Sequence, residues 1–200
     1  MIRSKEDLKF YLEQDKIALL EYDDQKYPRP FYDEVWKFQR ALRKAEYAVN
    51  CRAGIFFLPY RIFRKIIFHR HSVKCGFTIP LNVFEHGLSI AHYGTIVVNS
   101  NAKVGKNCRI QEGVNIGSSG GNEAPIIGNN VFIGTGAKIF GDISIADGVA
   151  IGAGAIVNKS VEEAGVSVAG NPAKIVSYNG AKRFISNKLE GNYSNESSAH

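Results

Sequence analysis

A six-residue period runs through the C-terminal half of the chain and limits the folds that are open to it. An amphipathic helix would repeat its apolar residues every three or four positions, and a doubly wound sheet would need helices between its strands. A fixed period of six is typical of a parallel β-helix. The aliphatic residues recur every six positions with a single interval of eleven, and they are Val98, Val104, Ile110, Ile116, Ile127, Ile133, Ile139, Ile145, Ile151 and Val157.

Each six-residue unit supplies one short strand and one tight turn, with the aliphatic side chain directed at the axis. Small or β-branched residues two positions earlier relieve crowding at the corner, and Gly or Asn supplies the turn dihedrals. Three units complete one triangular coil, so residues 18 apart should stack into internal ladders. Cys108 belongs to the series of small residues, and we predict that it fills the core.

The first 75 residues are instead predicted to be helical. Ser4 and Asp7 resemble a helix N-cap, and Pro28 and Pro30 separate elements. Apolar residues at three- and four-residue spacing in 35–49 predict a helix with one buried stripe. At the other end, we expect residues 179–200 to form a partly disordered tail, because 191–200 are polar.

The net positive charge of the chain arises in its N-terminal part. Residues 1–80 hold 16 Lys and Arg against 10 Asp and Glu, whereas residues 81–200 hold nine of each. Within the basic segment 52–74, residues 55–70 mix bulky apolar residues with arginine. We expect this apolar side to pack on the protein, and peripheral contact with an anionic membrane is the alternative. No recognition motif supports a nucleic-acid partner.

Two interruptions of the period are candidate sites for chemistry, because regular coils supply only a scaffold. Ile90 and Val98 are eight residues apart, and the extra residues fall in a segment that contains His92. The interval of eleven inserts the polar, glycine-rich segment 118–125. We expect both interruptions to border one cleft.

The hexapeptide pattern, the segment HYGTIVVNS (92–100) and the segment AGNPAKIV (169–176) are similar to hexapeptide-repeat acyltransferases with a left-handed β-helix. The serine-acetyltransferase-like branch, which includes O-acetyltransferases of surface polysaccharides and sugars, resembles the chain most. The resemblance implies a mainly β fold in which a helical region, 1–75, precedes a left-handed β-helix acetyltransferase domain, 76–178. It also implies acetyl-CoA as acetyl donor, a homotrimer with sites between subunits, and a cytoplasmic location.

The resemblance aligns His92 with the catalytic histidine of that branch. A neutral imidazole can take the hydroxyl proton of an alcohol that attacks a thioester directly. The aspartate that orients this histidine in serine acetyltransferases is replaced by Phe77. Glu85 is the nearest acid and our candidate to orient His92, a backbone carbonyl could serve instead, and His86 is an alternative base.

Two departures from the resemblance concern the acceptor. The family's aspartate before the histidine is replaced by Ala91, and its Arg-His-Pro by Glu123-Ala124-Pro125. Because this charge pair would hold an amino-acid zwitterion, we predict a sugar or saccharide acceptor in cell-surface polysaccharide synthesis. Serine O-acetylation in cysteine biosynthesis is the alternative, and a non-enzymatic structural β-helix is the second. Our candidate acceptor-binding residues are Asn82, Tyr93 and Asn115.

The resemblance also implies where acetyl-CoA binds. In the family, the pantetheine arm of this donor bonds to the backbone at turns made of small residues. Lysines would meet the nucleotide phosphates. A zinc site would need converging histidines, which the β-helix segment does not offer, so we expect no metal. The candidate acetyl-CoA-binding residues are Gly117, Ser118, Thr135, Gly136, Ala153, Lys159 and Lys174.

Overall fold

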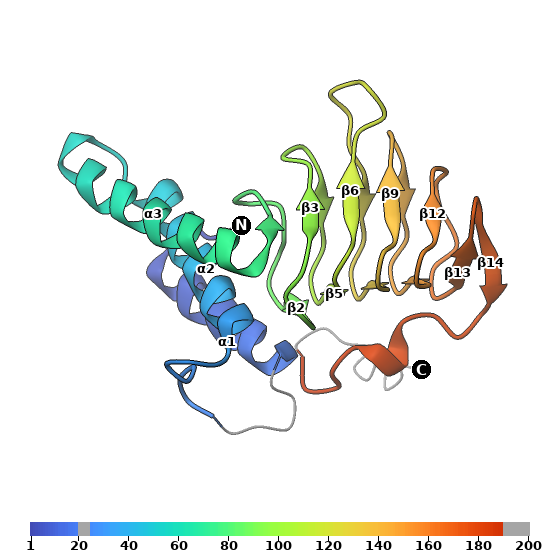
Figure 1. The fold of residues 1–200 in the computed structure, drawn as a ribbon, viewed down its shortest axis with the longest axis horizontal. Coiled ribbons are helices and arrows are strands. Elements are labelled where there is room, and N and C mark those ends of the chain that lie inside the picture. The colour runs from blue at the N-terminus through green and yellow to red at the C-terminus, as the bar shows by residue number, and fades with distance from the viewer. Residues whose placement is uncertain (20–24, 190–200) are drawn as a thin grey trace.

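The structure is a computed structural model, and it describes residues 1–19 and 25–189. Helices come first in the chain and strands follow (Figure 1). The helices are α1 (Lys5–Leu19), α2 (Glu34–Cys51), η1 (Ile55–Phe57), α3 (Leu58–Cys75) and η2 (Lys182–Phe184). The strands are β1 (Phe77–Thr78), β2 (Ser89–Ile90), β3 (Ile96–Val98), β4 (Lys103–Val104), β5 (Arg109–Ile110), β6 (Asn115–Gly117), β7 (Ile126–Ile127), β8 (Phe132–Ile133), β9 (Lys138–Phe140), β10 (Ser144–Ile145), β11 (Ala150–Ile151), β12 (Ile156–Val157), β13 (Ser167–Gly170) and β14 (Ala173–Ser177).

The described strands form the three sides of a parallel β-helix. One side is the five-stranded sheet β1-β3-β6-β9-β12, the second is β10-β7-β4, and the third is β14-β13-β11-β8-β5-β2. Pairing is parallel throughout, apart from the antiparallel closing pair β13 and β14. The predicted fold class is confirmed.

The strand register shows where each interruption of the period is accommodated. Val98 pairs with Ile116, which is the regular step of 18 residues. Ile90 pairs with Ile110, a step of 20, and Ile116 pairs with Ile139, a step of 23. The extra two and five residues therefore leave the ladder as loops, and the aliphatic side chains stay in line.

The core of the β-helix consists of these stacked aliphatic residues. Ile110, Ile133 and Ile151 pair in consecutive coils, and each is completely buried. Cys108 lies in the same core, as predicted, and burial raises the pKa of its thiol to about 12. This cysteine is a packing residue.

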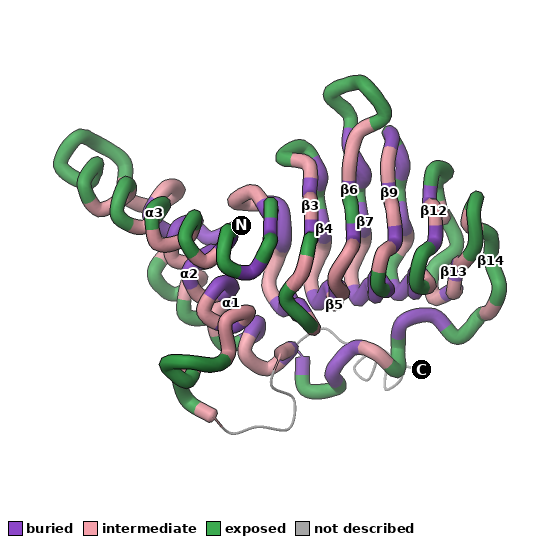
Figure 2. Tube along the Cα trace, in the orientation of Figure 1, coloured by how far each residue is buried: buried purple, intermediate pink, exposed green. Residues whose placement is uncertain are grey.

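The helices lie at the N-terminal end of the β-helix and extend its core (Figures 1 and 2). Phe38 and Leu42 of α2 belong to the same buried cluster as the aliphatic ladders, in agreement with the predicted stripe. The predicted cap is present as well, since the Asp7 backbone N–H donates to Ser4 Oγ at 2.9 Å. Helix α2 thus closes the open end of the first coil.

Two segments lie outside the coils, residues 55–70 and the segment that follows β14. The apolar side of 55–70 packs only in part, through Phe68, while Phe56 and Ile62 are exposed. The start of the C-terminal segment is packed: Ile185 and Leu189 are buried against Phe132 and neighbouring residues. Residues 191–200, for which we expected disorder, lie outside the described part of the chain.

The ladder predicts different effects for two adjacent isoleucines of β7. Ile127 is 2% exposed and pairs with Val104 and Ile145, whereas Ile126 is 53% exposed. We expect Ile127→Ala to lower the free energy of unfolding by about 2–4 kcal/mol, because it leaves a cavity between two coils. Ile126→Ala serves as the matched control and should change it by less than about 0.5 kcal/mol in urea titrations. Equal losses for the two variants would contradict the assignment of β7.

Candidate active site

His92 lies in the turn between β2 and β3, where the first interruption leaves the ladder. Its side chain is exposed and lines a cleft of about 260 Å³. The turn itself contributes three wall residues, and α1 and the start of α2 contribute the rest. The lining residues are Leu19, Asp33, Glu34, Val35, Trp36, Ala91, His92 and Tyr93.

The start of α2 brings two ionised carboxylates into the wall of this cleft. Hydrogen bonds from Arg29 hold the pKa of Asp33 well below its usual range, and the Arg29 Nη2 to Asp33 Oδ1 distance is 2.8 Å. A hydrogen bond from Lys37 likewise lowers the pKa of Glu34, which also pairs with Lys74 at 3.0 Å. The cleft therefore presents anionic groups, each with a cation beside it.

Sequence reasoning did not place the start of α2 at this site. The two carboxylates are almost 60 residues from His92 in the chain, and no periodicity links a helix terminus to a particular coil. Trp36 was also missed: it is 1% exposed, and its indole Nε1 has no hydrogen-bond partner within residues 1–19 and 25–189. A tryptophan in the first turn of a helix does not by itself indicate a functional site.

A column of glycine-containing turns begins beside His92 and runs along one edge of the five-stranded sheet. We call residues 94–95, 112–113, 135–136 and 153–154 the glycine corner. Backbone N–H groups join its levels: Gly113 donates to Thr95 at 2.7 Å, Gly136 to Glu112 at 2.9 Å, and Gly154 to Thr135 at 2.8 Å. The corner therefore connects the His92 turn to three of the candidate donor-binding residues, Thr135, Gly136 and Ala153.

Glycine is required in this corner by the close approach of successive coils. Gly113 has a φ of +74°, and a Cβ built there would lie 3.1 Å from the Gly136 Cα. Both the left-handed dihedral and the contact disfavour any larger residue. Every level of the corner contains a glycine, which places no side chain beside the backbone.

The second interruption lies at the opposite end of the same strands. Gly117 ends β6, and the loop 118–125 projects from that end (Figure 1). The Gly117 carbonyl accepts from the Gly141 N–H at 3.1 Å, so Gly117 and Ser118 belong to a different corner. Our expectation that both interruptions border one cleft is therefore not met within a single chain.

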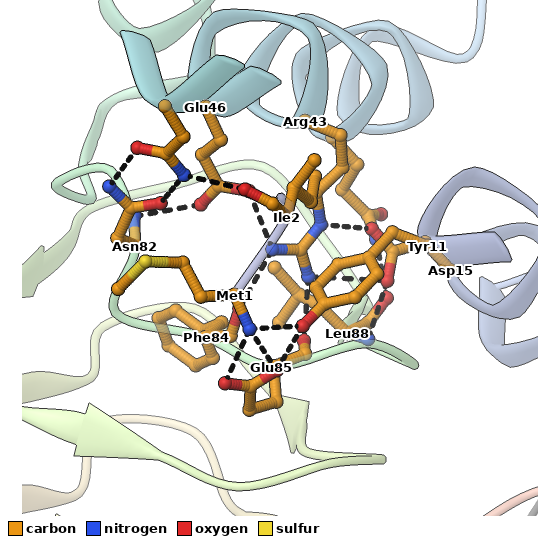
Figure 3. Close-up of polar contacts among 12 residues, drawn as sticks. Met1, Ile2, Tyr11, Asp15, Arg43, Glu46, Asn82, Phe84, Glu85 and Leu88 are labelled. Atoms are coloured by element: carbon orange, nitrogen blue, oxygen red, sulfur yellow. Dashed lines mark hydrogen bonds and ion pairs between the residues drawn. The ribbon is translucent and has the colours of Figure 1, made fainter. Parts of the chain in front are cut away.

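Glu85, our candidate to orient His92, makes other contacts (Figure 3). Its carboxylate accepts from the Met1 amine at 2.8 Å and from the Tyr11 hydroxyl, and it does not line the His92 cleft. Burial raises the pKa of Glu85, but these hydrogen bonds outweigh it, and the pKa lies below its ordinary value. Among the described residues, none is hydrogen-bonded to His92 or paired with it.

The Glu85 contacts belong to a larger polar network centred on Arg43. This side chain is fully buried, and its Nε lies 2.7 Å from Asp15 Oδ2 while Nη1 lies 3.0 Å from Glu46 Oε2. The guanidinium also donates to the backbone carbonyls of Phe84 and Glu85, at 2.8 and 2.7 Å. The network ties α1, α2 and the first coil together (Figure 3).

The remaining candidate residues are spread over the molecule. Asn82 exchanges hydrogen bonds with Asn50 of α2, so its amide is engaged away from the cleft. Tyr93 lines the cleft and is 73% exposed, while Asn115 is exposed on β6 outside the cleft lining. His86, the alternative base, packs against the rings of Phe10 and Tyr11.

The two candidate lysines are exposed near the C-terminal end of the β-helix. Lys159 follows β12, and Lys174 lies on β14. Over residues 1–19 and 25–189, no group of three His, Cys, Asp or Glu side chains is placed to hold a metal ion. In the same ranges, no helix has the length and apolar character to cross a membrane.

No family model matches the chain. The serine acetyltransferase of Synechococcus elongatus is 36% identical over 125 residues, which cover 60% of this chain and 51% of the relative. The chain spans about half the length of the curated relatives it matches.

Solved structures match over a larger share of both chains. A bacterial hexapeptide-repeat serine O-acetyltransferase from Brucella melitensis is 31% identical with a TM-score of 0.64, covering 88% of this chain and 69% of that one. Serine acetyltransferase from Brucella abortus in complex with coenzyme A is 30% identical with a TM-score of 0.64, covering 88% and 70%. The chain belongs to the hexapeptide-repeat β-helix acyltransferases.

These relatives correct the predicted branch and acceptor. They are serine acetyltransferases, so the predictions of a polysaccharide or sugar O-acetyltransferase and of a saccharide acceptor are wrong. The prediction of a sugar acceptor rested on Ala91 and the segment 123–125, positions within the β-helix. It did not include the charges that α2 adds to the same cleft, Asp33 and Glu34 with their cations.

The contacts of Glu85 predict a structural role with a defined pH dependence. The pKa of Glu85 is lowered in the folded protein. The contacts of its carboxylate therefore stabilise the folded state fully above the ordinary glutamate pKa, and this stabilisation is lost as the pH falls through the folded-state pKa. We expect Glu85→Gln to lower the free energy of unfolding at pH 7 by no more than about 1 kcal/mol, because the group is half exposed. The difference from the parent should shrink below about pH 4, as urea unfolding at both pH values would measure.

A catalytic role would give another result. If Glu85 oriented His92, Glu85→Gln would shift the pH profile of acetyl transfer without changing the unfolding midpoint.

Proposed function

We propose that the chain is an acetyl-CoA-dependent O-acetyltransferase that transfers the acetyl group to the hydroxyl of serine. One observation carries the proposal: an exposed imidazole, His92, lines a cleft whose wall holds ionised carboxylates beside cations, at the start of the glycine corner. The identity with serine acetyltransferases supports the same conclusion. The products would be O-acetylserine and coenzyme A.

In this proposal His92 is the general base. It takes the proton from the serine hydroxyl as the oxygen attacks the acetyl carbonyl, and it returns the proton to the departing sulfur. Neutral imidazole suits this role near pH 7, and direct transfer needs no acyl-enzyme. Backbone N–H groups of the adjacent turn are the candidates to stabilise the oxyanion.

The acceptor would be held at the start of α2. Serine carries both an ammonium and a carboxylate. Asp33, in the cleft wall, would hold the ammonium group, and Arg29, which is paired with Asp33, would turn to the carboxylate. This pair would replace the aspartate and the arginine of the family, where the β-helix of this chain has Ala91 and Glu123. Tyr93 would cover the acceptor from the side of the turn.

Acetyl-CoA would lie along the glycine corner. Thr135, Gly136 and Ala153 would bond the pantetheine arm through their backbone, and Lys159 and Lys174 would meet the nucleotide phosphates. Gly117, Ser118 and Asn115 lie elsewhere on this chain, so they would serve a site shared with a neighbouring subunit. We place the enzyme in the cytoplasm as part of this proposal.

A homotrimer would bring the two corners together in one site shared between neighbouring subunits. The loop 118–125 projects away from the His92 cleft of its own chain and would reach the cleft of the next subunit. We expect sedimentation equilibrium to give three times the chain mass of 22.0 kDa. A monomer that retains full acetyl transfer would contradict the shared site.

The central prediction concerns His92. We expect His92→Ala to lower kcat for serine-dependent release of thiol from acetyl-CoA by about 100- to 10,000-fold, because the general base is lost. KM for acetyl-CoA should change little. His69→Ala removes another exposed imidazole, on α3, and should retain the parent's kcat as a matched control.

Acceptor analogues test the charge recognition in the same assay. Ethanolamine lacks the carboxylate and glycolate lacks the ammonium group, so both should react more slowly than serine. Glucose and a nucleotide sugar complete the panel. Equal rates for serine and glycolate, or full turnover by His92→Ala, would contradict the proposal, and an inert panel without coenzyme A binding would favour a structural β-helix.

A further inference from the structure

The outward face of α3 carries an apolar stripe that no described part of the chain covers. Leu58, Ile62, Ile66 and Val73 follow one another at spacings of four, four and seven residues, which places them on one face of the helix. Their exposed fractions are 37%, 49%, 52% and 67%. Phe68 and Cys75, on the other side of the helix, face the interior.

The turn before α3 continues this apolar surface. Ile55, Phe56 and Phe57 form η1, and Phe56 is 92% exposed. This turn lies at the end of the molecule farthest from the β-helix, and it is exposed throughout (Figures 1 and 2). We call residues 55–58, 62, 66 and 73 the α3 face.

Cations border the α3 face on both sides. At 100° per residue, Arg61 and Lys65 lie along one flank of the stripe, and Arg70 and Lys74 lie along the other. Lys74 also pairs with Glu34, while the sequence holds no acidic residue between Glu46 and Glu85. The exposed His69 also lies within the stripe, between Leu58 and Ile62 in angle. The surface is therefore mainly apolar along its centre and positive along its edges.

We propose that the α3 face docks on an anionic lipid surface. Apolar side chains on one helix face bordered by Lys and Arg match the layers of a membrane interface, where acyl chains lie beneath anionic headgroups. A second copy of the chain fits less well, since two α3 faces would bring like charges together. Because no described helix could cross a bilayer, the contact is peripheral.

The docking does not rest on the proposed acetyl transfer, and vesicle sedimentation tests it alone. The full chain is mixed with vesicles of phosphatidylcholine and phosphatidylglycerol (3:1) or of phosphatidylcholine alone, at low and high salt. We expect binding to the anionic vesicles that weakens with salt, and at least tenfold weaker binding to neutral vesicles. Absence of binding to anionic vesicles, or equal binding to both, would overturn the proposal.

Two pairs of variants locate the contact. Phe56→Ser with Ile62→Ser removes apolar side chains, and Arg61→Ser with Lys65→Ser removes charge; each pair should weaken vesicle binding at least tenfold. The matched controls, Val176→Ser with Tyr178→Ser and Lys103→Ser with Lys182→Ser, change exposed residues elsewhere and should bind like the parent. If the Phe56 pair changes the sedimenting mass but not vesicle binding, the face is a subunit contact and the proposal fails.

Discussion

The stacking of one aliphatic side chain on another in successive coils is the constraint on which the rest of the structure depends. The completely buried Ile110, Ile133 and Ile151 each have an aliphatic partner above and below. A shift of one residue at Ile110 would turn Arg109 or Gln111 into the core. Extra residues can therefore leave the coil only at a corner. The step of 20 between Ile90 and Ile110 and the step of 23 between Ile116 and Ile139 are two such departures. Loops thus arise without loss of core packing.

A second constraint joins the helices to this scaffold. Arg43 is fully buried and satisfies two carboxylates and two backbone carbonyls from three parts of the chain. A charge removed from water is tolerated only when it is paired and hydrogen-bonded in this way. Asp15 extends the arrangement by accepting from the Leu88 N–H at 2.9 Å, directly before β2. The start of α2 is consequently held in a fixed position over the His92 turn.

Much of the β-helix could be predicted from the sequence, because its period reports a local geometric rule. The aliphatic ladder, the core position of Cys108 and the location of both interruptions follow from counting residues. The surroundings of His92 could not be predicted in this way. Glu85 is near in sequence but turns towards Tyr11, while Asp33 arrives from a helix whose packing depends on long-range contacts. Arg43 and Glu46 lie three residues apart on α2, a spacing at which opposite charges pair on one face of a helix. This spacing indicated a buried ion pair, and the sequence analysis did not use it.

Helix α2 links the buried network and the cleft in a single rigid element. Its middle is anchored by Arg43, and its first residues form the wall opposite His92. The two walls of the cleft therefore come from different segments of the chain. The coils position the imidazole and the glycine corner, and the helix positions the carboxylates. In the proposed function the helix start holds the acceptor and the coils hold the donor. Replacement of the helix start would then alter which molecule is accepted while every coil stays as it is, so acceptor choice and donor use would be free to diverge independently.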